Sequence, residues 1–423
     1  MDYVGTHLES AMALYRQREG WLYKDRVDMQ SMIDMEYRLR VHIHVLSKCI
    51  SEDDPEPGEA PDTFLYLATR FSSKNTEEVK KAAVQACEWL LEDSPMAHGA
   101  RDALLLFPSP DVYSQMQKTY SEVESLRPVI IYILSQHGAR LPKSLTHQAD
   151  IQKKDPYLQA QTLYYASNNL NSDLNMFKEN YESLITQHER SDVEHTVLLA
   201  SLWGGLIRGD KDARIALSRA IEHEADDIAR LDFLRYAALT GDANYYPLLC
   251  QVTEHAPEIG YHFLALHGKT NSVETILEGL IHPRTAEYAE EAWWWVSGQI
   301  LPKKPRLSVV GEEEEEGAAE QAEEVGYVPD AQIAEQWWYK QSSEPDTRWL
   351  QGQPFSLDNL KKLMIQYTGS ISNDLFDLFS LASQTPVQLG NQTWHDARLR
   401  KINRLECSAS PQLNEINKEV RSA

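Results

Sequence analysis

The chain has 423 residues, of which 42% are hydrophobic and 25% charged, and its formal net charge is −23. This much apolar material excludes wholesale disorder. The negative charge argues against a nucleic acid or an anionic membrane as partner. We therefore expect a folded protein, and its charge is compatible with a basic protein partner.

The chain start, MDYVGTHLES, has neither the basic beginning nor the apolar stretch of a signal peptide. No apolar run approaches the roughly 20 residues of a membrane-spanning helix. The four cysteines, Cys49, Cys87, Cys250 and Cys407, lie far apart and form no CxxC pair, which favours reduced thiols. These features predict a cytoplasmic protein.

Helix signals begin in residues 1–60, which we expect to form an N-terminal helical cap. In SMIDMEYRLRVHIHVLSK, Met35, Leu39, Ile43 and Leu46 recur at steps of four, four and three. This spacing places them on one face of an amphipathic helix. Strand-like alternation is nearly absent along the chain. The sequence therefore predicts an all-α protein.

A period appears within residues 61–302. Gly209, Gly241, Gly268 and Gly298 follow apolar helical segments, at spacings of 32, 27 and 30 residues. A left-handed glycine commonly ends a helix, so each should lie in a turn between two helices. Such a helical hairpin cannot bury its apolar face alone and stacks on its neighbours. We expect a HEAT-like α-solenoid; the alternative is an irregular α-bundle with chance glycines.

An acidic segment interrupts the helices. Residues 311–330 hold nine acidic and no basic side chains, and such runs are typically solvated linkers. We expect a flexible acidic linker over residues 303–330, the alternative being a segment docked on a basic surface. A C-terminal helical block with a frayed tail is predicted over residues 331–423.

Three blocks of the chain together resemble one known family. They are HLESAMALYRQREGWLYKD…MIDMEYRLRVHIHVL, YAALTGDANYYPLL…PRTAEYAEEAWWWVSGQIL and TRWLQGQPFSLDNLKKL. The family is an uncharacterised proteobacterial group of HEAT-like proteins, often encoded beside type VI secretion components such as spike, PAAR and effector genes. The chain departs from the family pattern at residues 295–297, where Trp-Val-Ser stands in place of Ile-Thr. The resemblance implies an α-solenoid in a secretion-related setting and no known catalytic residues.

The chain has only weak sequence motifs for a catalytic site or a metal site. His42 and His44 point to different sides of a helix, and His262 and His267 are five apart, so neither pair suits shared ligation. His223 lacks the second histidine of an HExxH motif. We interpret these histidines as surface or capping residues. The chain also has no GxSxG motif, no phosphate-binding glycine loop with lysine and no zinc-spaced Cys/His set, so we predict no enzyme, cofactor or metal.

Large aromatic side chains crowd the last repeats and the C-terminal block. The residues that we expect to bind a partner are Tyr245, Tyr246, Trp293, Trp294, Trp295, Trp337, Trp338 and Trp349. Successive side chains on a helix are about 100° apart, so the rings of residues 293–295 fan over roughly 200° and no single core face takes all three. One or two should pack in the core. The outward ring is covered either by the C-terminal block or by another protein.

These observations predict a non-enzymatic protein-interaction scaffold, an adaptor or chaperone that helps to load a type VI effector or spike. An immunity protein that blocks a toxin is an alternative, because the net charge of −23 suits a basic partner. A second alternative, from a different class, is an enzyme with its site on the concave surface of the solenoid.

Overall fold

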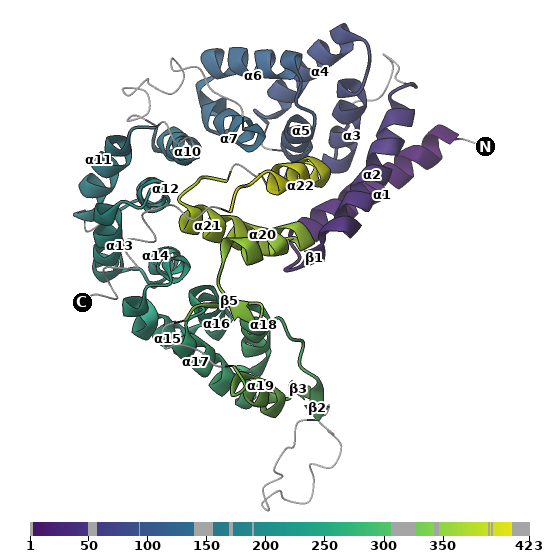
Figure 1. The fold of residues 1–423 in the computed structure, drawn as a ribbon. Helices are drawn as coiled ribbons and strands as arrows, with labels where there is room; N and C mark the ends of the chain where they lie inside the picture. The colour runs from purple at the N-terminus through teal and green to yellow at the C-terminus, as the bar shows by residue number, and fades with distance from the viewer. Residues whose placement is uncertain are drawn as a thin grey trace, which may run out of the picture. The chain divides into compact units, whose positions relative to one another are not determined.

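The computed structural model describes residues 3–49, 57–92, 94–138, 155–168, 172–187, 190–305, 327–341, 347–387, 390 and 392–407. The chain forms two compact units, unit 1 with Met1–Arg219 and Lys361–Ala423, and unit 2 with Ala220–Leu360. The described residues are predominantly helical (Figure 1), which confirms the predicted all-α class. Among these residues no helix combines the length and the apolar character needed to cross a membrane.

Unit 1 combines helices from the first half of the chain with helices from its last part. Its helices are α1 (Tyr3–Leu22), α2 (Met29–Leu46), α3 (Ala60–Phe71), α4 (Thr76–Trp89), α5 (Pro95–Leu106), α6 (Pro110–Glu122), the 3-10 turn η1 (Glu124–Leu126), α7 (Arg127–His137), α10 (Pro156–Ser167), α11 (Leu174–Ile185), α12 (Asp192–Leu206), α21 (Ile371–Ser383) and α22 (His395–Asn403). Strand β1 (Val27–Asp28) pairs antiparallel with β6 (Tyr367–Thr368). Helices α13 (Lys211–His223) and α20 (Leu357–Gln366) run across the unit boundaries.

The amphipathic helix predicted in the first 60 residues is present as α2. Met35, Leu39, Ile43 and Leu46 are all buried on it, as the spacing predicts. Asp28 begins the helix because its carboxylate accepts a backbone N–H of the first turn. The local sequence therefore accounts for both the start and the buried face of α2.

Late residues of unit 1 pack against much earlier helices. Trp394 lies edge-on to Phe107, the residue that follows α5, with ring centroids 5.6 Å apart. The hydroxyl of Tyr132 on α7 donates to the side chain of Gln392 at 3.1 Å. Figure 1 shows the yellow helix α22 among the purple and blue helices of the same unit. The core of unit 1 is thus closed by the C-terminal part of the chain.

Unit 2 is a smaller group of helices with two short strand pairs. Its helices are α14 (Asp227–Thr240), the 3-10 turn η2 (Ala243–Tyr245), α15 (Tyr246–His255), α16 (Pro257–His267), α17 (Thr270–Ile281), α18 (Ala286–Ser297) and α19 (Ala331–Trp338). Strand β2 (Lys303–Pro305) pairs antiparallel with β3 (Tyr327–Pro329), and β4 (Trp349–Leu350) with β5 (Gln353–Pro354).

The unit boundaries differ from the segments expected from the sequence. The expected repeat region, 61–302, and the expected C-terminal block, 331–423, are each divided between the two units. The two ends of the expected linker form the β2–β3 strand pair. Residues 306–326, which include the run of glutamates, lie outside the described residues.

The predicted glycine turns are confirmed. Gly209, Gly241, Gly268 and Gly298 have positive φ angles between 61° and 74°. The last three directly follow α14, α16 and α18. A residue with a Cβ atom is strained in this left-handed region, so glycine is the residue that ends these helices without cost.

Candidate functional site

The three consecutive tryptophans lie inside unit 2. Trp293 is 0% exposed, Trp294 8% and Trp295 6%, so none of the rings faces solvent. The three side chains point in different directions around α18, yet all are buried because the helix is contacted by α16, α17, β3 and β4. The sequence predicted that one ring points outward and is covered either by the C-terminal block or by another protein. In the structure all three rings are covered by residues of the same chain.

The C-terminal block supplies part of this cover. Trp337 meets Trp293 edge to face with centroids 5.5 Å apart, and Trp338 meets Trp349 in the same way at 5.3 Å. Aromatic pairs of this kind contribute about 0.5–1.5 kcal/mol beyond the area that they bury. Of the eight residues expected to bind a partner, Tyr246 and Trp337 keep partly exposed side chains and the others are buried. Partner binding by this group stays a prediction.

A segment following α19 crosses the ends of three helices in unit 2; we name residues 347–352 the clasp. The guanidinium of Arg348 donates to the carbonyl of Leu239 at 3.1 Å and to the carbonyl of Leu266. These carbonyls lie at the C-terminal ends of α14 and α16, where unpaired acceptors and the negative end of the helix dipole favour a cation. Burial lowers the pKa of Arg348 to about 10, so the side chain stays charged at neutral pH.

The clasp continues to the end of α18. The backbone N–H of Gln351 donates to the carbonyl of Trp295 at 3.0 Å, and that of Gly352 to the carbonyl of Val296 at 2.8 Å. The clasp therefore satisfies acceptors that the last turn of a helix leaves unpaired. It ties α14, α16 and α18 together on the side where all three end.

The glycines that end these helices also make room for the clasp. A Cβ atom at Gly268 would lie 2.8 Å from the carbonyl oxygen of Trp349, and one at Gly241 would lie 3.1 Å from the guanidinium of Arg348. The glycines thus have two roles, a positive φ angle and a close approach of the backbone. Only the first of these roles was predictable from the sequence.

His267 was expected to be a surface or capping residue; it is fully buried, so the surface alternative is wrong. Its Nε2–H donates to the carbonyl of Asp242 at 3.1 Å, and its Nδ1 lies 2.6 Å from the hydroxyl of Ser272. Burial lowers its pKa to about 4, so the ring is neutral and bridges two successive turns. The other histidines that drew attention keep exposed or half-exposed side chains: His42, His44, His223 and His262.

Unit 1 contains a buried charged group, centred on Glu36, that the sequence analysis missed. One oxygen of Glu36 accepts hydrogen bonds from Arg18 Nε at 2.7 Å and from His395 Nδ1 at 2.8 Å. The other oxygen accepts a hydrogen bond from the backbone N–H of His395 at 2.8 Å. The three side chains are at most 1% exposed. Glu36 and His395 lie 359 positions apart, so no local pattern could pair them.

The surroundings of His395 decide its protonation state. Its Nε2 lies 3.2 Å from a guanidinium nitrogen of Arg398, which can only donate, so Nε2 is an acceptor and the proton sits on Nδ1. Burial lowers the pKa of His395, in agreement with a neutral ring. Burial alone would raise the pKa of Glu36, but the interactions with His395 and Arg18 lower it to about 2. This group is sealed from solvent and fastens α22 to α1 and α2.

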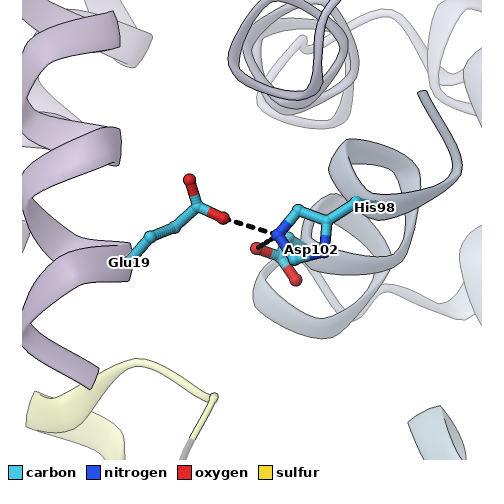
Figure 2. A group of neighbouring side chains, drawn as sticks. All are labelled: Glu19, His98 and Asp102. Atoms are coloured by element: carbon cyan, nitrogen blue, oxygen red, sulfur yellow. Dashed lines mark hydrogen bonds and ion pairs between the residues drawn. The ribbon is translucent and has the colours of Figure 1, made fainter. Parts of the chain in front are cut away.

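A second polar cluster in unit 1 is open to solvent. Glu19 reaches from α1 toward His98 and Asp102, which are one turn apart on α5 (Figure 2). His98 Nε2 lies 2.5 Å from Glu19 Oε1 and 3.8 Å from Asp102 Oδ2. The side chains of Glu19 and His98 are 24% and 36% exposed, and that of Asp102 is 7% exposed. One nitrogen and two oxygens within 4.8 Å of one another form a group that could hold a metal ion.

Two further residues control this cluster. The buried hydroxyl of Tyr15 donates to Asp102 Oδ2 at 2.8 Å, and Arg101 lies 2.8 Å from His98 Nδ1. Burial and the charge of Asp102 raise the pKa of Tyr15, so its hydroxyl keeps the proton that it donates. The spacing of His98 and Asp102 in HGARD indicates a shared helix face. Nothing in the sequence indicates that Glu19 faces them.

Comparisons of the chain with protein-family models, with curated proteins and with solved structures gave no match.

Proposed function

We propose that this protein is a non-enzymatic protein-interaction scaffold, built as a HEAT-like α-solenoid, that serves type VI secretion as an adaptor or chaperone. The repeated unit supports the solenoid: in unit 2, helices end in left-handed glycines at regular intervals and are tied along that end by the clasp. The resemblance of three sequence blocks to secretion-associated proteins motivates the setting. An extended row of helices offers a partner several repeats at once.

The observation that carries the proposal is a set of exposed apolar side chains on adjoining elements of unit 2. We name it the α18–α19 surface; it consists of the exposed residues Tyr288, Ile300, Tyr327, Ile333 and Tyr339. Strand β3 packs on α18, and α19 packs on α17, which in turn packs on α18. Exposed large apolar groups mark interaction sites when they gather, whereas single ones are ordinary. Helix α18, which carries Tyr288 of this surface, also carries the buried residues Trp293, Trp294 and Trp295.

The proposal is tested by crosslinking and affinity capture of the full chain in its native host, followed by mass spectrometry. We expect the wild type to recover a secreted effector, toxin or spike component. Combined Ile300→Ala and Tyr339→Ala changes should reduce that recovery tenfold or more, corresponding to about 1.4 kcal/mol. Since these side chains are 83% and 84% exposed, the melting temperature should stay unchanged.

The matched control is Ile228→Ala, at a position on α14 that is 79% exposed and outside the α18–α19 surface. It should leave capture unchanged. Equal recovery by the wild type and the Ile300/Tyr339 variant would move the binding face elsewhere. Recovery of partners with no link to secretion would overturn the proposed setting.

An immunity protein is the second candidate, supported by the net charge of −23. Acidic side chains would steer a basic toxin and accelerate its association, an effect that fades as salt rises. The two roles differ in consequence. A captured toxin that loses its activity at stoichiometric amounts of this protein identifies an immunity role, and a captured effector that stays active identifies an adaptor.

A further inference from the structure

The cluster of Glu19, His98 and Asp102 has the composition of a metal site. Imidazole nitrogen and carboxylate oxygens are ligands of divalent first-row transition metals. A tetrahedral ion about 2.1 Å from each ligand atom sets those atoms about 3.4 Å apart. In the structure they are 2.5 Å and 3.8 Å apart along the two contacts of His98. Shifts of about 1 Å or less would bring these two contacts to that spacing, and the three ligand atoms already lie within 4.8 Å of one another.

The charges of the cluster match the same kind of ion. Two carboxylates and a neutral imidazole carry two negative charges, which a divalent cation neutralises. The cluster is half-buried, so an ion can enter from solvent while the surrounding protein strengthens its attraction to the carboxylates. By contrast, the group around Glu36 is sealed, and each oxygen of that carboxylate already accepts a hydrogen bond.

Tyr15 provides the outer support that metal sites need. Its side chain is fully buried and stacks on Phe64 with centroids 4.3 Å apart, so its position is fixed. From there its hydroxyl donates to Asp102 Oδ2 at 2.8 Å. Hydrogen bonds of this type orient ligating carboxylates and hold them ready for the ion.

The contact between Arg101 and His98 shows which ring nitrogen of His98 carries the proton when no metal ion is bound. A guanidinium only donates, so Nδ1 accepts from Arg101 and the ring carries its proton on Nε2, facing Glu19. An ion bound to Nε2 takes the place of that proton, and the ring then carries its proton on Nδ1. Arg101 must then turn away, which its 30% exposed side chain permits. Arg101 is thus a competitor of the metal.

The geometry points to a binding site for a divalent transition-metal ion, Zn²⁺ or Mn²⁺, formed by Glu19 of α1 with His98 and Asp102 of α5. Three protein ligands leave at least one position for water, as in open metal sites. The ion would connect α1 to α5, where the structure now has a hydrogen bond between Glu19 and His98. This inference is independent of the proposed scaffold function.

The test is isothermal titration calorimetry of the full chain, freed of metal with a chelator, against zinc chloride and manganese chloride. We expect one ion per chain, with Kd at or below about 10 μM for at least one of the two metals. Magnesium should bind at least about tenfold more weakly, because it disfavours imidazole. His98→Gln and Glu19→Gln should each weaken binding tenfold or more, and Tyr15→Phe by about tenfold.

Two variants make the result decisive. His223→Gln removes an exposed histidine of α13 and should leave the affinity unchanged, which shows that loss of an exposed histidine elsewhere does not by itself weaken binding. Arg101→Gln should strengthen binding about threefold or more, because a competing cation is removed. Glu19 is half-exposed, so Glu19→Gln provides a folded variant if His98→Gln unfolds. Absence of binding by the wild type, or unchanged affinity in folded Glu19→Gln, would overturn the site.

Discussion

The two units are both closed by a late stretch of chain, but they fasten it with different chemistry. In unit 2 the clasp pairs with the carbonyls at helix ends, through backbone N–H groups and Arg348. In unit 1 helix α22 is fastened by the buried carboxylate of Glu36 with Arg18 and His395. Helix ends present acceptors that many donors can satisfy. A buried carboxylate needs particular cationic and hydrogen-bonding partners.

This difference implies unequal tolerance to change. Losing one donor of the clasp leaves a neutral carbonyl with fewer hydrogen bonds, a modest cost. Losing one member of the Glu36 group leaves a charge buried without compensation, which is costly. Unit 1 should therefore be sensitive to single changes in its charged group, and unit 2 to changes that keep the clasp from approaching.

The largest effect is expected for Glu36→Gln. The change removes the carboxylate that Arg18 and His395 share and leaves the guanidinium buried without its anion, so we expect a loss of about 3–5 kcal/mol in the stability of unit 1. Hydrogen exchange of α2 and α22 peptides measures this unit separately. The control is Asp396→Asn, whose ion pair with Arg40 is partly exposed and should contribute less than about 1 kcal/mol. Equal effects of the two changes would remove the distinction between buried and exposed pairs.

The next effect is a loss of stability of unit 2 in acid. The pKa of His267 is lowered from the ordinary 6.5 to about 4 in the folded chain. Between these two pH values the imidazole is protonated in the unfolded state and neutral in the folded state. Stability should fall by about 1.4 kcal/mol per pH unit between pH 6.5 and 4, about 3 kcal/mol in all. Urea unfolding followed by tryptophan fluorescence measures it, and His267→Gln should flatten the slope.

The same measurement in unit 1 sharpens the comparison. His395 also has a lowered pKa, so the stability of unit 1 falls as the pH drops below 6.5. Glu36 adds a second pH range in which this stability falls. Its pKa is lowered from 4.5 to about 2, so its contribution is present above pH 4.5 and is lost as the pH falls toward 2. Hydrogen exchange should show unit 1 weakening further below pH 4, where the contribution of His267 is already lost. A unit 1 that is insensitive between pH 4.5 and 2 would contradict this assignment.

Replacing the glycines that end α14 and α16 tests how closely the clasp approaches these helix ends. Gly268→Val should cost about 2 kcal/mol or more, because its φ is positive and the new Cβ would meet the backbone oxygen of Trp349. Gly241→Val should cost less, about 1 kcal/mol, because the movable side chain of Arg348 can shift. Gly20→Ala is the control: it lies within α1 in open space and should stabilise by about 0.5–1 kcal/mol. Thermal unfolding measures all three, and a reversed order of the first two would place the clasp elsewhere.

The smallest effect concerns the aromatic cover of α18. Trp337→Leu keeps an apolar side chain but removes the edge-to-face pair with Trp293, and should cost about 1 kcal/mol in urea unfolding. Tyr339→Leu, two positions along and 84% exposed, should have no measurable effect on stability. If Trp337→Leu is equally silent, the edge-to-face pair with Trp293 does not stabilise unit 2.

Local patterns in the sequence were enough to predict the helical class, the buried face of α2 and the glycine turns at residues 209, 241, 268 and 298. These features depend on interactions within a few residues: the period of a helix, a capping side chain and the left-handed conformation of glycine. The exposure of His267 and the cover of the tryptophans were not predictable in this way. Both depend on which distant segments approach them.

The remaining features arise from contacts between residues far apart in the chain. Glu36 meets His395 across 359 positions, and Glu19 meets His98 across 79. The sequence supplies the carboxylates and imidazoles but not their distances, because such pairs form only when helices from different parts of the chain pack together. Local backbone energetics placed the helices and their ends; the packing of distant segments then set which charges are buried, which rings are covered and where a metal ion could bind.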